Sequence, residues 1–164
     1  MTKDTGIDLE RITEATDEAR LLIGELDQLL AAEYLPEQRH GLALEALFQP
    51  RICFFLARLN GVAVGCGGIA LFDGFVEVKR MYVRPTVRGR GLAQALLTRI
   101  EIEARIAGFV ILRLETGERQ TAALRFYVRA GFRPCAAFGD YAAMRPKDIA
   151  TSIFMEKRLA KQTA

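Results

Sequence analysis

The stretch that decides the fold runs from residue 78 to residue 93 and reads VKRMYVRPTVRGRGLA. It predicts a strand, a turn containing Gly89 and Gly91, and a helix that begins at Leu92. The first amides of a helix have no acceptor within it, and the helix dipole adds partial positive charge there. Such a turn favours an anion, most often a phosphate. Five basic residues and no acidic one lie between Lys79 and Arg90, which strengthens that expectation.

The same residues are also compatible with a plain glycine turn that has a solvated basic edge. Two known phosphate loops can be excluded. A Walker loop needs Gly-Lys followed by Ser or Thr, and the chain has no such run. The dinucleotide fingerprint needs a third glycine at the position of Gln94. It also follows the first strand of a parallel βαβ unit, which is not where this turn lies.

The strand before the turn belongs instead to a predicted antiparallel meander. Strands are expected at Ile52–Leu59, Val62–Phe72 and Phe75–Val83, joined by the two-residue turns Asn60-Gly61 and Asp73-Gly74. Three glycines in the middle strand indicate a bulge or a close approach by another group: Gly65, Gly67 and Gly68.

Helices and further strands are predicted on either side of the meander. Before it we expect a strand over 6–13, a helix capped by Thr16 or Asp17, and a second short helix between Pro36 and Pro50. After it we expect a helix over 92–107, a strand over 109–115 buried on both faces, and a helix over 121–130. Two short strands, 132–135 and 151–157, complete the chain and flank an irregular stretch over 136–149.

Composition narrows the class of protein. The 164 residues are 51% hydrophobic and carry a net charge of +3, as expected of one folded domain over 1–164, and so mild a charge does not by itself imply a nucleic-acid partner. No segment has the length of a membrane span, and the first residues do not resemble a signal peptide. Three scattered cysteines and a single histidine, His40, argue against a metal site or a Ser-His-Asp triad and predict a cytoplasmic location.

Two motifs together resemble the GNAT superfamily of acyl-CoA-dependent N-acetyltransferases. The hexapeptide RGRGLA over 88–93 matches the family signature Arg/Gln-x-x-Gly-x-Gly/Ala. The run Ala123-x-x-Phe126-Tyr127-x-x-x-Gly131-Phe132 is similar to the second conserved helix of the family and the turn after it. Segments near the C-terminus, around 138–141 and 152–157, further resemble a bacterial subgroup of indole-acetate-type acetyltransferases.

The resemblance implies a mixed α+β fold and a bound cosubstrate. A mostly antiparallel sheet of six or seven strands, with a V-shaped splay, would be flanked by about four helices. Acetyl-CoA would lie in the splay as cosubstrate, with no metal. The expected contacts are the backbone of Met81, Tyr82 and Val83 for the pantetheine arm, the turn Arg88, Gly89, Arg90, Gly91, Leu92 and Ala93 for the pyrophosphate, and Gln120 in place of the usual asparagine.

The resemblance also implies the catalytic groups. Tyr127 matches the family tyrosine that protonates the departing thiolate, although an aromatic residue at this spacing is compatible with a purely core role. Glu77 stands where many members place the general base, and its other interpretation is a partner for Lys79 on the same strand face. Glu115 is the competing carboxylate. A carboxylate of ordinary pKa is a poor base for an ammonium unless burial raises that pKa.

The acceptor is not identified by any motif. The family takes its acceptor between the N-terminal helices and the terminal hairpin, where the candidates are Glu33, Tyr34, His40, Arg51, Phe138 and Tyr141. Cys66 is compatible with a nucleophile or with a small buried thiol. The expected reaction is acetyl transfer to a small-molecule or peptide amine by direct attack in a ternary complex. The alternatives are a catalytically silent acyl-CoA sensor and a nucleic-acid-binding module, and a homodimer is common among similar proteins.

Overall fold

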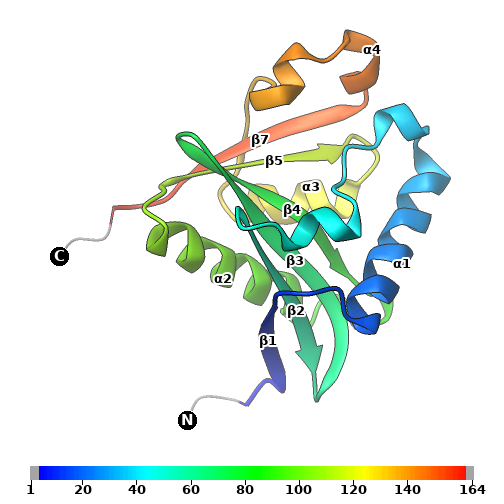
Figure 1. Ribbon diagram of the computed structural model, residues 1–164, viewed down its shortest axis with the longest axis vertical. Coiled ribbons are helices and arrows are strands. Elements are labelled where there is room, and N and C mark those ends of the chain that lie inside the picture. The colour runs from blue at the N-terminus through cyan, green and yellow to red at the C-terminus, as the bar shows by residue number, and fades with distance from the viewer. Residues whose placement is uncertain (1–3, 162–164) are drawn as a thin grey trace.

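A computed structural model describes residues 4–161, which form a seven-stranded sheet with helices on both faces (Figure 1). The strand order is β1-β2-β3-β4-β5-β7-β6, and β4 and β5 are the one parallel pair among the described strands. The strands are β1 (Ile7–Ile12), β2 (Ile52–Leu59), β3 (Val62–Phe72), β4 (Phe75–Val83), β5 (Ile111–Gly117), β6 (Arg133–Pro134) and β7 (Ser152–Arg158). The helices are α1 (Asp17–Glu33), α2 (Leu92–Ile106), α3 (Thr121–Arg129) and α4 (Pro146–Ile149).

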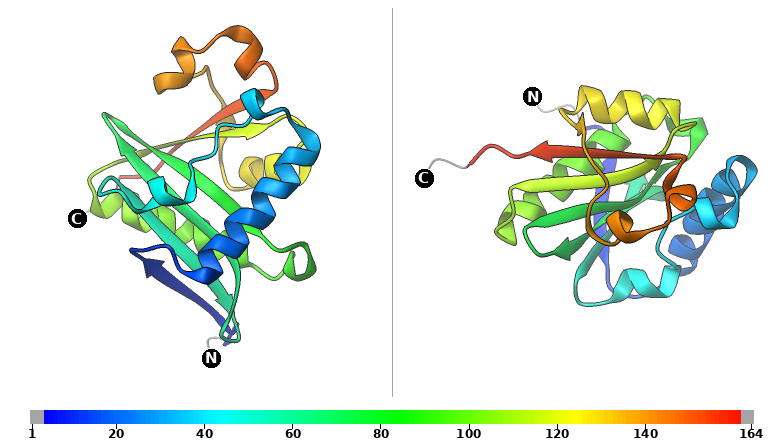
Figure 2. Two further views of the ribbon diagram at one scale, coloured as in Figure 1. Left: turned by 45° about the vertical axis from the view of Figure 1, so that its right-hand side comes forward. Right: turned by 90° about the horizontal axis from the view of Figure 1, so that it is seen from above.

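The mixed α+β architecture expected from the sequence is thereby confirmed. Side chains of β2 alternate between the two faces of the sheet. Phe54 and Leu56 pack in the cluster that contains α1, whereas Phe55 and Ala57 pack in the cluster that contains the start of α2. Figure 2 shows α1 in front of the strands and α2 behind them. None of the described helices has the length and apolarity needed to cross a membrane.

The meander has the predicted ends, and its first turn has the predicted geometry. Asn60 and Gly61 both have positive φ, 49° and 86°, as a type I′ hairpin turn requires. The predicted irregularity is also present. Opposite Gly67, strand β4 carries one extra residue, and Arg80 takes a left-handed φ of 55° to accommodate it. A Cβ on Gly67 would lie 2.3 Å from the sulfur of Met81, so the glycine leaves room for the Met81 side chain.

Strands β4 and β5 contact each other over only two residue pairs and then separate. The pairs are Val76 with Leu112 and Glu77 with Arg113. Beyond them β4 continues to Val83 alongside β3, and β5 continues to Gly117 alongside β7. Figure 1 shows the two strands diverging toward α3. The predicted V-shaped splay is therefore present between β4 and β5.

Three sequence predictions need correction. The single helix expected between Pro36 and Pro50 is two short 3₁₀ helices, Pro36–Gln38 and Leu44–Phe48, because the backbone is extended at Arg39 and Ala43 between them. The strand expected over 109–115 begins at Ile111 and is fully buried at Leu112 and Leu114, with its other residues half-buried. The stretch 136–149, expected to be irregular, contains a 3₁₀ helix at Gly139–Ala143 and the short α4.

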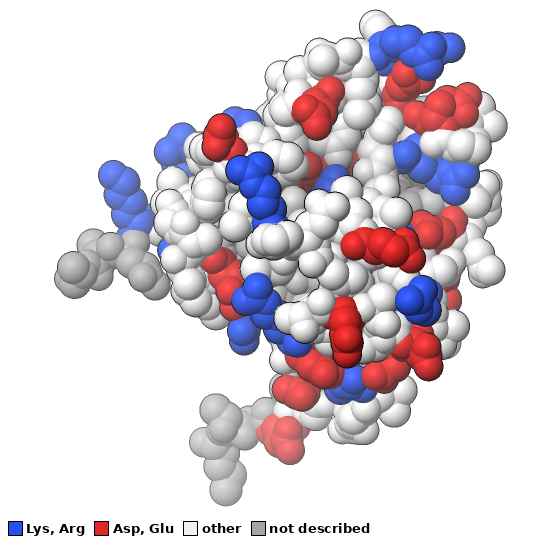
Figure 3. All heavy atoms as spheres, in the orientation of Figure 1, with Lys and Arg blue, Asp and Glu red and all other residues white. Residues whose placement is uncertain are grey.

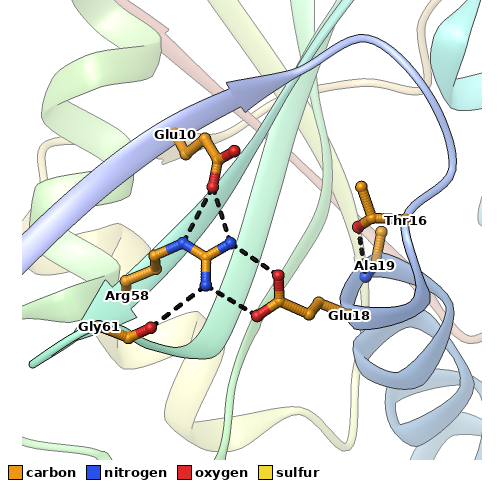
Figure 4. A network of polar contacts seen from close by, with 6 residues as sticks. All are labelled: Glu10, Thr16, Glu18, Ala19, Arg58 and Gly61. Carbon is orange, nitrogen blue, oxygen red and sulfur yellow. Dashed lines mark hydrogen bonds and ion pairs between the residues drawn. The ribbon is translucent and has the colours of Figure 1, made fainter.

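The first helix is attached to the edge of the sheet by a local cap and by an ion-pair network. The Thr16 hydroxyl accepts a hydrogen bond from the amide of Ala19 at 3.1 Å, as the predicted cap requires. Charged side chains gather at the lower right of the face drawn in Figure 3, over α1 and β1. There the Arg58 guanidinium contacts the carboxylates of Glu10 and Glu18 at 2.7–2.9 Å (Figure 4). One side chain of β2 thus links β1 and α1.

The close strand packing generates a stability prediction with a matched control. A Cβ on Gly68 would lie 2.5 Å from the carbonyl oxygen of Cys53, and backbone cannot give way as a flexible side chain can. We expect Gly68→Ala to lower the free energy of unfolding by about 1–3 kcal/mol. Gly24→Ala in α1 meets nothing within 4 Å and should raise it by about 0.5–1 kcal/mol. Urea titrations of both variants check this, and equal midpoints would contradict it.

Candidate active site

A cavity of about 130 Å³ lies in the wedge between the diverging strands β4 and β5. We call it the wedge cavity. Glu77 and Met81 line it from β4, Glu115 lines it from β5, and Tyr127 lines it from α3. Because the β4–β5 ladder ends at Glu77, this edge of β4 has no strand partner from Val78 onward. The wedge therefore brings titratable side chains together with unpaired strand edges.

A larger cavity of about 650 Å³ continues from the wedge toward the turn before α2. The two cavities share Leu26, Met81, Gln120, Ala123 and Tyr127, so they are adjacent. Nine of the ten cofactor contacts expected from the sequence line this second cavity: Met81, Tyr82, Val83, Arg88, Gly89, Gly91, Leu92, Ala93 and Gln120. Arg90 is exposed and is not among the lining residues.

The turn before α2 has the geometry of an anion-binding loop. Gly89 and Gly91 have φ of +79° and +89°, a left-handed conformation that side chains disfavour. Within residues 4–161 no acceptor binds the backbone amides from Gly89 to Gln94. Those amides sit at the positive end of the α2 dipole. This donor set fits a diphosphate.

Fewer basic residues of this segment are available to bind an anion than the sequence suggested. Three of the five are ion-paired within the fold: Lys79 with Glu77, Arg80 with Asp27, and Arg84 with Glu25. The partners of Arg80 and Arg84 come from α1, which spacing along the chain could not reveal. Arg88 and Arg90 remain exposed, and Arg88 Nε donates to the carbonyl of Val83 at 3.2 Å. The expected excess of positive charge is therefore reduced to these two side chains.

Two further basic residues line the second cavity and were not predicted. Arg119 precedes α3, and Arg129 is its last residue. Arg119 also donates to the backbone carbonyl of Glu33 at 3.2 Å and lies 3.8 Å from its carboxylate. Two positions in the sequence could have indicated them. Arg119 is next to Gln120, and Arg129 is on the same helix as Tyr127.

Tyr127 lies where the wedge and the second cavity meet. Its ring packs against Phe126 and Phe132, with centroids 5.4 and 5.5 Å away. Burial raises the pKa of Tyr127 above the ordinary phenol value, so the group keeps its proton at neutral pH. Tyr127 thus packs in the core, as the structural interpretation of the sequence expected. It also lines both cavities, as a role in catalysis would require.

Glu77 is the centre of a buried polar cluster. Its side chain is only 3% exposed, and its Oε2 atom accepts hydrogen bonds from Lys79 Nζ at 2.9 Å and from the Tyr141 hydroxyl at 2.6 Å. Lys79 Nζ also donates to the Tyr141 oxygen at 3.0 Å. The partnership with Lys79 considered from the sequence is present. No described side chain donates to Oε1, the second oxygen of Glu77.

Glu115, the competing carboxylate, lies across the wedge without an ion-pair partner among the described residues. The Ser152 hydroxyl donates to its Oε2 at 2.6 Å. Burial raises the pKa of Glu115, and the Ser152 hydrogen bond and the charges of His40 and Lys79 oppose that rise in part. A neutral acid is therefore favoured at this position more than at an exposed glutamate.

The residues expected at the acceptor side fall into two groups. Tyr34 lines the wedge, and its hydroxyl accepts from the amide of Arg119 at 2.8 Å, whereas the Glu33 side chain is exposed and lines none of the three cavities described here. The other four line a third cavity of about 440 Å³ at the opposite side of the wedge: His40, Arg51, Phe138 and Tyr141.

Cys66 has the properties of a structural thiol. It is fully buried, its sulfur donates to the carbonyl of Arg80 at 3.4 Å, and burial raises its pKa to about 12. All three cysteines are free. In the part of the chain that the structure describes, no group of three or more His, Cys, Asp or Glu residues could hold a metal ion.

Comparison with known proteins assigns the family. The Acetyltransferase (GNAT) family profile matches residues 23–132. The chain is 43% identical over 155 residues to an IAA acetyltransferase of Azospirillum brasilense, covering 93% of this chain and 98% of that one. It is 34% identical to the uncharacterized N-acetyltransferase YsnE of Bacillus subtilis (strain 168), over 76% of this chain and 81% of that one.

Solved structures agree with that assignment. A Klebsiella pneumoniae chain provisionally described as an acyl-CoA N-acyltransferase superposes with a TM-score of 0.76 at 34% identity, covering 96% of this chain and all of that one. A GNAT family acetyltransferase from Elizabethkingia anophelis with acetyl-CoA bound shares the fold, with a TM-score of 0.65 at 20% identity over 96% of this chain and all of that one. The fold and site thus define an acyltransferase enzyme. The chain belongs to the GNAT family of acetyltransferases, as the motifs at 88–93 and 123–132 predicted.

The half-buried Glu115 generates a prediction on pH and stability. Because its pKa is raised on folding, its ionisation opposes folding, and stability is lost as pH rises from the unfolded value near 4.5 through the raised folded value. Glu115→Gln removes that loss. We expect the gain in unfolding free energy from Glu115→Gln to be larger at pH 8 than at pH 5 in urea titrations. Exposed Glu118→Gln is the control, and a gain from Glu115→Gln independent of pH would contradict the argument.

Proposed function

We propose that this protein transfers an acetyl group from acetyl-CoA to a primary amine by direct attack in a ternary complex. The observation that carries the proposal is the wedge between β4 and β5. It connects the free amides before α2 on one side with the buried carboxylate of Glu77 on the other. The three free cysteines support a reducing, cytoplasmic location.

The second cavity is proposed to hold the cosubstrate. The amides of Gly89 to Ala93 would bind the pyrophosphate, with Arg88 and Arg90 adding charge at the solvent side. The unpaired edge of β4 at Met81–Val83 supports a role in binding the pantetheine amides, and Gln120 lines both cavities beside it. Bound acetyl-CoA would supply the activated acetyl thioester. The acetyl-CoA bound in the Elizabethkingia anophelis relative supports this assignment.

Tyr127 is proposed as the proton donor to the departing thiolate. Its raised pKa keeps the hydroxyl protonated at neutral pH, and its position where the two cavities meet supports contact with the reacting end of the cosubstrate. No described side chain donates to or accepts from the Tyr127 hydroxyl, so its proton is available to a ligand.

Glu77 is proposed as the group that takes the proton of the acceptor amine. It lines both the wedge and the third cavity, whereas Glu115 lines the wedge alone. Lys79 and Tyr141 both contact Oε2, and this arrangement leaves Oε1 as the acceptor for an ammonium proton. A backbone amide near Met81–Val83 would stabilise the oxyanion of the tetrahedral intermediate.

The role of the turn is tested with two glycines of similar conformation. Gly91 and Gly74 have φ of +89° and +83°, and a Cβ on either has no neighbour closer than 3.9 Å. Gly91→Leu and Gly74→Leu should therefore lose similar stability. Only Gly91→Leu places a side chain beside the free amides, and we expect it to weaken CoA binding at least tenfold by calorimetry. Unchanged affinity for CoA in Gly91→Leu would exclude the turn as the pyrophosphate site.

Two conservative variants test the reaction itself. A thiol-release assay with acetyl-CoA and a panel of primary amines measures kcat for the unmodified protein, for Tyr127→Phe and for Glu77→Gln. We expect each variant to lower kcat about 10²-fold, since each removes one proton-transfer group. Calorimetry should give unchanged CoA affinity for both. If CoA binds but no amine is acetylated, the protein is an acyl-CoA sensor and the proposed function is wrong.

A further inference from the structure

The third cavity, which we call the acceptor basin, has a chemical character that narrows the substrate class. This inference rests on the proposed function. The basin has a volume of about 440 Å³, within the usual range for small-molecule sites. It lies between the β3–β4 hairpin, the residues before β2, and the 3₁₀ helix Gly139–Ala143. Figure 3 shows this face hollowed below α4, with red and blue atoms at the floor of the hollow and white atoms around it.

The inner end of the basin is the reacting end. Glu77, Lys79 and Tyr141 line both the basin and the wedge cavity, so the buried cluster forms the boundary between them. An amine that enters through the basin meets the Glu77 carboxylate before it reaches the wedge. The remainder of the acceptor molecule must then occupy the basin.

The walls of the basin that would surround the rest of the acceptor are aromatic, and the aromatic rings pack against one another. Phe75 and Phe138 pack edge to face with centroids 5.4 Å apart, and Phe138 and Tyr141 do so at 5.3 Å. Phe72 stacks on Phe75 at 5.2 Å and is half-buried at the end of β3. Such a lining offers ring faces and edges for another apolar or aromatic group. Leu42 and Met144 complete the apolar surface.

The charges of the basin balance. Its charged lining residues are two cations, Arg51 and Lys79, and two carboxylates, Glu77 and Asp140, and Lys79 and Glu77 are paired with each other. Arg51 and Asp140 are exposed, so no unpaired buried charge lines the basin to offset the desolvation of a second charged group on the acceptor. A polyamine or a phosphonate-bearing amine would therefore gain little from this lining.

We propose that the acceptor is a primary amine with an uncharged body of about the size of an aromatic ring, which binds in the acceptor basin with its amino group toward Glu77. Phe72 acts as a specificity-determining residue, since it contacts the basin from a half-buried position outside the buried polar cluster.

The experiment compares acceptors with acetyl-CoA held saturating. The panel is 2-phenylethylamine, n-propylamine, spermidine and 2-aminoethylphosphonate. We expect kcat/KM for 2-phenylethylamine to exceed that of each of the others at least tenfold. Phe72→Ala should raise KM for 2-phenylethylamine about tenfold, leave kcat nearly unchanged, and leave the kinetics of n-propylamine unaffected. Ile106→Ala, a matched loss of an apolar side chain that is 74% exposed on α2, should change none of these values.

The outcomes separate this inference from the function on which it rests. Turnover of any amine supports the transferase function. If n-propylamine or a charged amine is then used as well as 2-phenylethylamine, or if Phe72→Ala affects all acceptors equally, the proposed acceptor class is wrong. If no amine is acetylated, calorimetry of 2-phenylethylamine with the CoA-loaded protein decides: binding weakened by Phe72→Ala supports the basin as an aromatic-amine site, and no binding overturns it.

Discussion

The separation of β4 from β5 is the constraint on which the rest of the site depends. On its outer side β4 pairs with β3, apart from the bulge at Arg80, and β5 pairs with β7, whereas β4 and β5 meet only at Val76–Leu112 and Glu77–Arg113. Beyond that point the inner edge of β4 has backbone donors and acceptors without a strand partner. Buried backbone groups of this kind need hydrogen bonds from somewhere. A ligand with amide groups can supply them, and this is the basis for proposing that the pantetheine arm lies along this edge.

The charges at the base of the wedge are better explained by chemistry than by stability. Burying an ion pair such as Glu77–Lys79 costs desolvation that the mutual attraction repays only in part. The Tyr141 hydroxyl reduces that cost by bonding to the same carboxylate oxygen as Lys79. Glu115, half-buried, with a raised pKa and a hydroxyl as its partner, adds a second partly desolvated carboxyl group across the same cavity. Such groups cluster where they serve a reaction.

Local patterns predicted the fold well because they depend on neighbouring residues. The turn residues Asn60 and Gly61, the Thr16 cap and the glycine turn before α2 each act over a few positions, and each is present as expected. Interactions over long separations were not accessible in the same way. Tyr141 meets Glu77 across 64 positions of the chain, and α1 supplies the acids that neutralise Arg80 and Arg84. The sequence therefore located the glycine turn before α2 but overestimated its positive charge and missed Arg119 and Arg129 as lining residues of the second cavity.

Tyr141 connects the two ends of the proposed reaction. Its ring is a wall of the acceptor basin, packed against Phe138 and Phe154, and its hydroxyl contacts the carboxylate that faces the wedge. Its pKa is raised by burial and by the Glu77 charge, so the hydroxyl remains a hydrogen-bond donor to Glu77 at neutral pH. A single side chain thus couples the shape of the basin to the state of the carboxylate. Substitution of Tyr141 would change the basin wall and the carboxylate together. Phe72 lies in the basin wall but outside the buried cluster. A substitution of Phe72 therefore separates recognition of the acceptor from proton transfer.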